Sequence, residues 1–149
     1  MKKDPTRESI QLKSGTDKET FIQSIDRISV YTEYADNFYG IETDGMNSWS
    51  WCSESGAIVF HNDTFKTQTV HISMNAYTDS SDISNLTVQY NDSSLTYEVN
   101  NKGSLIELDT ELNPGNNIFS FFSDAPRAHI DGDSRDLRFL IYNVSITLE

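Results

Sequence analysis

Trp49 and Trp51, the two tryptophans of the chain, stand two residues apart in the run Ser48–Cys52. On a β-strand both rings point the same way. Because Trp is usually buried to a large extent, the first interpretation is that both rings pack in the core. On an exposed face the same pair would form an aromatic platform, on which the apolar C–H faces of sugar rings can stack. Tyr39, beside the turn residue Gly40, is a further aromatic candidate for such a platform.

Glu42 follows this aromatic start and has two chemical uses. Its carboxylate can accept hydrogen bonds from a ligand. It can also form a structural ion pair with one of three arginines late in the chain, Arg127, Arg135 or Arg138. The planar guanidinium group matches a carboxylate well, and we favour the ion pair.

The loop Asp131–Asp136 combines carboxylates with Arg135. Asp131 and Asp133 have the alternate spacing of a calcium loop. An EF-hand, however, needs further ligands and a Glu at the twelfth position, where this chain has Tyr142. We therefore expect Asp133 to cap a turn and Arg135 to hold a neighbouring loop. The prediction is that no cofactor is bound, with calcium as the alternative.

Catalytic signatures are absent from the sequence. The three histidines, His61, His71 and His129, are scattered, and no metal-binding His or Cys motif occurs. Glycoside hydrolysis needs two carboxylates at a set distance, a signal that any acidic chain mimics. Cys52 is the only cysteine, so no intrachain disulfide forms, and its neighbours indicate a small core residue. The sequence predicts that the protein is not an enzyme.

Charge restricts the partners. The formal net charge is −12, from 23 acidic and 11 basic residues. Such a surface repels nucleic-acid phosphates and anionic lipids, so neither nucleic acid nor a membrane surface is an expected partner. No apolar run approaches the roughly 18 residues needed to cross a bilayer, and the start Met1–Ser9 lacks the apolar centre of a signal peptide. The chain is either a whole cytosolic protein or a soluble piece of a longer one.

The length of 149 residues suits a single domain. Residues 1–20 are polar and without period, which predicts a flexible linker or arm. Residues 21–149 are predicted to form one β-sandwich domain. The apolar residues of the run Phe21–Ile28 have helix-like spacing, and this run is either a turn of helix or an entering strand.

Short strands follow one another at about 8–12-residue spacing, separated by turn residues. This pattern predicts an all-β protein, an antiparallel β-sandwich of about eight to ten strands, with a jelly roll as the preferred arrangement. The run Leu105–Leu108 is expected to be a short strand. The run Ile118–Phe122, apolar at nearly every position, predicts burial on both faces. A change of phase at Tyr142–Asn143 predicts a β-bulge in the last strand.

Several short motifs occur in a characteristic order. They are Phe38-Tyr-Gly-Ile-Glu42, Ser48–Trp51, Ala57-Ile58, the turn Leu112–Asn117, Ser123–Pro126, Asp133–Phe139 and Ile141–Ile146. In this order, over residues 38–148, the chain resembles β-sandwich domains appended to bacterial membrane or surface proteins that build cell-envelope polysaccharides, glycosyltransferases among them. One departure is Ser50, which stands where that pattern often has a basic residue.

The resemblance implies a non-catalytic module that binds or positions a glycan. It also implies a set of ligand-binding residues, Tyr39, Glu42, Trp49, Trp51, Asp133 and Arg135. The expected partners are an oligo- or polysaccharide and the rest of a larger membrane-associated chain, at the cell surface. One alternative is a structural or protein-interaction sandwich with all of these aromatics in its core. A small glycan hydrolase is the third hypothesis.

Overall fold

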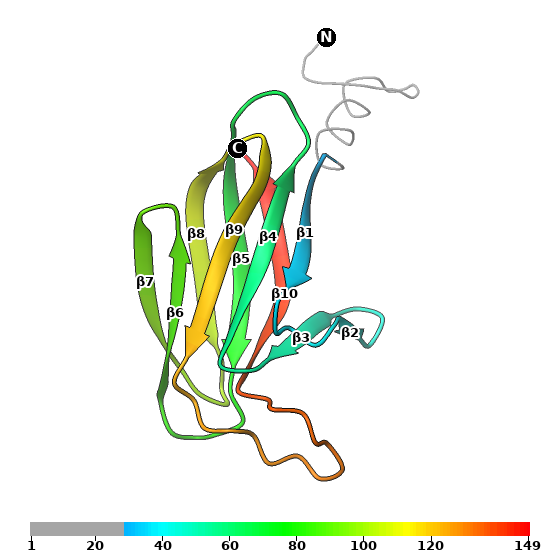
Figure 1. The fold of residues 1–149 in the computed structure, drawn as a ribbon, viewed down its shortest axis with the longest axis vertical. Helices are drawn as coiled ribbons and strands as arrows, with labels where there is room; N and C mark the ends of the chain where they lie inside the picture. Colours follow the sequence, from blue (N-terminus) through cyan, green and yellow to red (C-terminus); the bar gives the residue numbers. More distant parts are fainter. Residues whose placement is uncertain (1–28) are drawn as a thin grey trace.

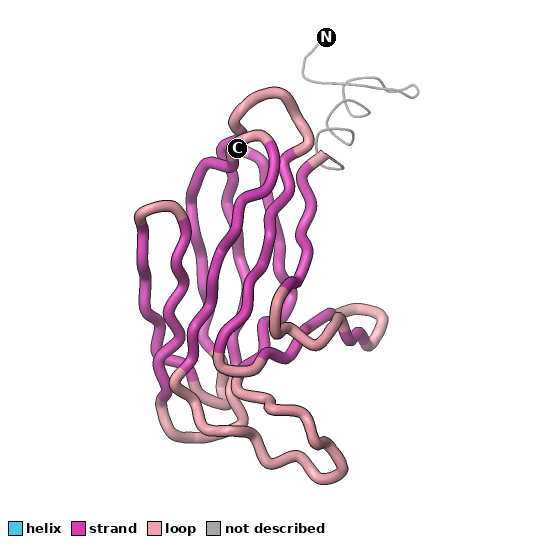
Figure 2. Tube along the Cα trace, viewed as in Figure 1, coloured by secondary structure: helices cyan, strands magenta, loops and turns pink. Residues whose placement is uncertain are grey.

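The computed structural model describes residues 29–149 and contains ten β-strands in that range. Most of them run along the long axis of the domain (Figure 2), and the two short strands within residues 42–52 run across it (Figure 1). The strands are β1 (Val30–Ala35), β2 (Glu42–Thr43), β3 (Ser48–Cys52), β4 (Ser55–Asn62), β5 (Gln68–Tyr77), β6 (Ser84–Tyr90), β7 (Ser93–Val99), β8 (Ser104–Leu112), β9 (Gly115–Ser123) and β10 (Phe139–Leu148).

The strands form two antiparallel five-stranded sheets. Sheet A has the order β1-β4-β9-β6-β7, and sheet B has the order β2-β3-β10-β5-β8. In Figure 1 sheet A lies in front of sheet B. Without the edge strands β1 and β2, the eight remaining strands alternate between the sheets except at the β6–β7 hairpin of sheet A, as in a double-sheet jelly roll. The predicted fold class, an antiparallel jelly-roll sandwich, is confirmed.

The core lies between the sheets and is built from alternate residues of each strand. An aromatic cluster fills one part of it. Phe38 lies 6.1 Å from Phe121 and 5.8 Å from Phe139, measured between ring centroids, and both contacts are edge-on. Cys52 is fully buried, and burial raises the pKa of its thiol to about 12. The thiol therefore stays protonated, which confirms its interpretation as a core residue.

The outer face of β9 corrects one prediction. Ile118 is 59% exposed and Phe122 is 45% exposed, so the run Ile118–Phe122 is not buried on both faces. Only Phe119 and Phe121 point into the core. The reason is the number of layers: in a two-layer sandwich each sheet has one covered face, and nothing in residues 29–149 covers the outer face of β9.

The last strand contains the predicted bulge. The pairing of β10 with β5 shifts between Tyr142 and Ser145, and Asn143 has a positive φ of 53°. Its side chain accepts a hydrogen bond from the Ser48 backbone N–H at 2.9 Å and donates one to Asn47 Oδ1 at 2.9 Å. The bulge is thereby attached to the turn between β2 and β3. The expected short strand at Leu105–Leu108 is in fact longer, because all nine residues of β8 pair with β5.

The two ends of the described chain lie at one end of the sandwich. Ser29 accepts a hydrogen bond from Asp63 N in the β4–β5 connection, and Glu149 donates one to the Thr69 carbonyl at the start of β5. The loop 124–138 lies at the opposite end (Figure 1). The predicted arm at residues 1–20 and the run Phe21–Ile28 fall outside the described residues. Residues 29–149 include no helix with the length and hydropathy needed to cross a bilayer.

Candidate functional site

The outer face of sheet B brings aromatic side chains together. On β3, Ser50 and Cys52 point into the sandwich, so Trp49 and Trp51 point outward and are only partly buried. The interpretation of both rings as core residues is therefore wrong. Strand pairing then places Trp51 beside Leu140, and Trp49 beside Tyr142.

Pairing across β10 and β5 extends these rows. Leu140 lies opposite Tyr77, so Trp51, Leu140 and Tyr77 form one row across three strands. Trp49 and Tyr142 form the second row. We call the four rings, Trp49, Trp51, Tyr77 and Tyr142, the aromatic platform.

Ring contacts fix the shape of the aromatic platform. Tyr142 lies in the middle, stacked on Trp49 with a centroid distance of 5.8 Å and an interplanar angle of 20°. Tyr77 meets Tyr142 edge-on, at 5.8 Å and 79°. Gly103, with a φ of +89°, lies directly under the Tyr77 ring, and a Cβ there would overlap that ring. Glycine is thus required at this turn both for its backbone conformation and for the position of Tyr77.

The aromatic platform forms one side of a pocket of about 470 Å³, with Leu140 beside it. Four polar residues complete the lining, namely Asp44, Thr78, Asp79 and Asn101. Asp44 comes from the β2–β3 turn, and the other three come from the connections after β5 and β7. An apolar aromatic surface with a few polar groups around it is the usual composition of a small-ligand site.

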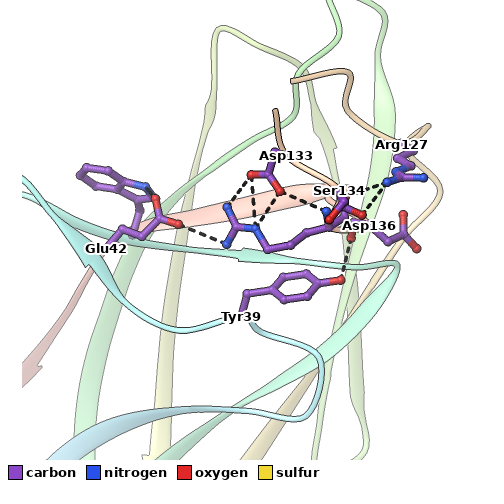
Figure 3. Close-up of polar contacts among 8 residues, drawn as sticks. Tyr39, Glu42, Arg127, Asp133, Ser134 and Asp136 are labelled. Carbon is purple, nitrogen blue, oxygen red and sulfur yellow. Dashed lines mark hydrogen bonds and ion pairs between the residues drawn. The ribbon is translucent and has the colours of Figure 1, made fainter. Parts of the chain in front are cut away.

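Glu42 lies next to this pocket and is held on both of its oxygens. The Trp49 indole Nε1–H donates to Glu42 Oε1 at 2.9 Å, and Arg135 Nη1 lies 3.3 Å from Glu42 Oε2 (Figure 3). The predicted structural ion pair is confirmed, with Arg135 as its cation. Glu42 therefore orients the Trp49 ring within the aromatic platform.

Arg135 is held in turn by Asp133. Its Nε and Nη2 donate to the two oxygens of that carboxylate, at 3.0 and 2.7 Å, and its backbone N–H donates to Asp133 Oδ1 at 3.0 Å. These bonds from Arg135 lower the pKa of Asp133 to about 2 and raise the pKa of Arg135. Asp133 is thus the expected turn cap. Both of its oxygens are engaged by Arg135, and calcium at Asp131 and Asp133 stays an untested alternative.

Tyr39 completes this group. Its ring is 42% exposed, it faces the Arg135 guanidinium at 5.4 Å, and its hydroxyl donates to the Asp136 carbonyl at 3.3 Å. In Figure 3 Tyr39 and Glu42 come from one segment and Asp133 comes from the loop 124–138. Five of the six predicted site residues therefore form one contact network, Tyr39, Glu42, Trp49, Asp133 and Arg135. Trp51, the sixth, lines the pocket beside it.

Sequence reasoning missed Tyr77 and Tyr142, and also Asp44, Asp79 and Asn101. A signal was available for the two tyrosines. Each stands at an outward-facing position of a strand whose alternate, inward-facing residues are apolar. The polar residues lie in turns, where alternation predicts nothing.

Replacement of Arg135 by Met should weaken the contact network. The change leaves Glu42 and Asp133 as like charges without their shared cation, and Glu42, which accepts the Trp49 indole N–H, loses its second contact. Because the guanidinium is partly exposed, we expect a loss of about 1 kcal/mol in the free energy of unfolding, together with a red shift of tryptophan emission. Urea denaturation followed by fluorescence measures both. Lys66→Met, the same charge change on a loop at the far end, should leave both unchanged; equal stability of the two variants would contradict the prediction.

A second polar cluster lies farther along the outer face of sheet B. His71 Nδ1 is 2.8 Å from Asp109 Oδ1, and Nε2 is 3.4 Å from Glu107 Oε2. The hydrogen bond with Asp109, followed by the contribution of Glu107, raises the pKa of His71. The same bond lowers the pKa of Asp109. The pair is therefore fully charged at weakly acidic pH.

This pair predicts a specific pH dependence of stability. Because the folded-state pKa of His71 is raised, its stabilising effect is complete below the ordinary value of about 6.5 and is lost as the pH rises through the raised value. His71→Gln should therefore lower the melting temperature at weakly acidic pH and have little effect at alkaline pH. Thermal melts across this range test it, with His129→Gln as the control. A His71→Gln effect that is the same at every pH would count against the pair.

Comparisons with known proteins find similarity in structure only. No family model and no curated protein matches the chain. A mutant CBM29-2, a family 29 carbohydrate-binding module, is 12% identical with a TM-score of 0.42, over 80% of this chain and 81% of that one. A family 35 carbohydrate-binding module from an environmental isolate is 15% identical with a TM-score of 0.45, over 80% and 96%.

A third similar solved structure is that of a protease. The secreted serine protease VesC from Vibrio cholerae is 16% identical with a TM-score of 0.46, over 79% of this chain and 24% of that one. Similarity at this level adds no argument about what the present chain binds. Any such argument must come from the pocket itself.

Proposed function

We propose that the protein is a non-catalytic carbohydrate-binding module whose site is the pocket over the aromatic platform. The observation that carries the proposal is the outward placement of four aromatic rings on three adjacent strands, beside polar groups. Rings that served only as packing would lie between the sheets, as Phe121 and Phe139 do.

The chemistry of a saccharide fits this surface. One side of a pyranose ring presents C–H groups, which can pack against the faces of Trp51 and Tyr142. Its hydroxyl groups lie at the edge of the ring, where the carboxylates of Asp44 and Asp79 and the amide of Asn101 can bind them. Glu42 and Arg135 would act indirectly. Glu42 accepts the Trp49 indole N–H, and Arg135 holds Glu42. Tyr39 and Asp133 support Arg135 from two sides.

The carboxylates do not favour a hydrolase. A glycosidase needs a general acid whose pKa is raised toward neutrality. Hydrogen bonds lower the pKa of Asp44, which lines the pocket, and of Asp133, which is the opposite of what a general acid needs. Glu42, which accepts the Trp49 indole N–H, and Asp133 are both bound to Arg135. The function proposed is therefore binding without hydrolysis.

We extend the proposal to the setting of the module. It would recognise or position a cell-surface glycan as part of a larger polysaccharide-biosynthesis or surface protein, outside the cytoplasm. This part depends on the sequence resemblance alone. Expression of the natural full-length gene product, followed by cell fractionation and surface protease treatment, tests it.

Fluorescence titration with a panel of bacterial and plant oligosaccharides tests the binding itself. Trp49 and Trp51 both border the pocket, so a bound sugar should change the tryptophan emission saturably. The expected result is a response to at least one class of oligosaccharide and no release of reducing ends. If no oligosaccharide of the panel changes the emission and calorimetry also detects no binding, a structural sandwich is the better interpretation.

A further inference from the structure

The pocket over the aromatic platform is acidic on two sides. Asp44 stands on the β2–β3 turn and Asp79 follows β5, and both line the pocket. No Lys, Arg or His is among its lining residues. A ligand seated on the rings therefore lies between two carboxylates without a cation at the pocket wall.

The cations of residues 29–149 are largely committed elsewhere. Arg135 is bound by Glu42 and Asp133, and Arg138 is bound by Asp136. Arg127 donates to the carbonyls of Ser134 and Arg135. Of the two lysines in this range, Lys66 is on the β4–β5 connection at the far end of the sandwich, and Lys102 is an exposed neighbour of Asn101. Two basic residues of this range stand next to the pocket lining, Lys102, which follows Asn101, and His129, whose backbone N–H donates to Asp79.

Both carboxylates are held in place by backbone groups. Asp44 Oδ1 accepts hydrogen bonds from Met46 N at 3.0 Å and Asn47 N at 2.8 Å. These bonds lower the pKa of Asp44, so it remains charged in weakly acidic solution. Asp79 Oδ2 accepts a hydrogen bond from His129 N at 3.3 Å. Each carboxylate keeps lone pairs for a ligand, and neither needs to be ordered when the ligand binds.

We propose, as a deepening of the proposed function, that the pocket selects glycans that carry free amino groups over neutral and anionic glycans. An ammonium group on a sugar ring seated on the platform can pair with Asp44 or Asp79 and can also lie over an aromatic face. A uronic acid in the same position would meet the two carboxylates and be repelled. The ligand class is therefore an oligosaccharide of N-unsubstituted hexosamine.

The expected preference follows from the exposure of the groups. An exposed ion pair changes affinity by up to about fivefold, and a cation over an aromatic ring contributes a similar factor. Two carboxylates and the aromatic platform together should give about a tenfold preference for the amine-bearing ligand at low salt. Added salt should reduce that preference, because both carboxylates are exposed.

The experiment uses three oligosaccharides with the same β-1,4-linked backbone and a different group at C2. They are glucosamine hexamers with the free amine, the N-acetylated hexamer, and cellohexaose with a hydroxyl. Calorimetric titrations of the full chain are run in weakly acidic buffer of low ionic strength, where the amine is protonated. The variants are Asp44→Asn, Asp79→Asn and Tyr142→Ala. Asp92→Asn, which removes the same charge on the β6–β7 turn of sheet A, is the matched control.

The amine-bearing hexamer should bind about tenfold more tightly than the other two. Asp44→Asn and Asp79→Asn should each reduce that preference by about two- to fivefold. Tyr142→Ala should weaken the binding of the hexamer by about 10- to 100-fold, and Asp92→Asn should change nothing. Equal affinity for all three hexamers would overturn the selectivity and leave the proposed function standing. A preference that survives both Asn changes would also overturn it, because the overall charge would then be its source. If none of the three hexamers binds while another sugar of the panel does, the selectivity fails alone; if nothing in the panel binds, the proposed function fails with it.

Discussion

Tyr142→Ala should reduce the affinity for the oligosaccharide that binds best by about 10- to 100-fold. The ring occupies the middle of the aromatic platform and contacts both Trp49 and Tyr77. A sugar that covers roughly 100 Å² of ring surface gains about 2.5 kcal/mol from that burial, and the alanine variant forfeits most of it. The neighbouring rings also lose their common support. Isothermal titration calorimetry of the wild type and the variant gives the difference directly.

Tyr142→Phe is the matched control for this prediction. It keeps the ring, its stacking on Trp49 and its contact with Tyr77, and it removes only the hydroxyl. We expect its affinity to stay within about threefold of the wild type, because stacking depends on the ring face. Wild-type affinity in Tyr142→Ala would mean that the sugar binds elsewhere, and the pocket over the platform would lose its assigned role.

Phe139→Ala should lower the free energy of unfolding by about 3–5 kcal/mol. Phe139 is fully buried, lies 5.8 Å from Phe38 and 6.4 Å from Phe121 between centroids, and belongs to the central strand of sheet B. Its removal leaves a cavity between the sheets that these two rings can fill only in part. Urea denaturation followed by circular dichroism measures the loss.

Phe139→Leu, which keeps most of the side-chain volume, should cost less than half as much. Phe139 and Tyr142 lie on opposite faces of the same strand, and this allows a separation of roles. Folded Phe139→Ala should bind sugar nearly as well as the wild type, and Tyr142→Ala should stay nearly as stable as the wild type. A variant of Phe139 that folds normally but no longer binds would show that the two faces are coupled.

The fold could be predicted because its signal is local. The alternation of apolar and polar residues along β5, from Val70 to Ala76, predicts which residues face the core. The change of phase at Asn143 predicts the bulge. The run Ile118–Phe122 misled for the same reason. Apolar residues at consecutive positions predict two covered faces, and the number of layers in a fold is a property of the whole chain that no single segment contains.

The site could be predicted only in part. The spacing of Trp49 and Trp51 shows that both rings share a face, but it does not show which face is covered. That is settled by Ser50 and Cys52, whose small side chains fit the interior of β3. Tyr77 and Tyr142 join the platform through strand register, which depends on the pairing of segments more than sixty residues apart. That Glu42 forms an ion pair could be predicted. Which of the three arginines is its partner depends on the path of the loop that carries Arg135, and the sequence does not show that path.

The position of the chain ends has a practical consequence. Ser29 contacts the β4–β5 connection and Glu149 contacts the start of β5, whereas Asp79 and Asn101 lie in connections at the other end of the sandwich, near the loop 124–138. A biotin tag or a fluorescent protein fused behind Glu149 would leave the aromatic rings facing away from its attachment point. Molecules immobilised through that tag on a sensor chip would present their rings to the flowing solution, and a cell wall or insoluble polymer could be probed with the same fusion.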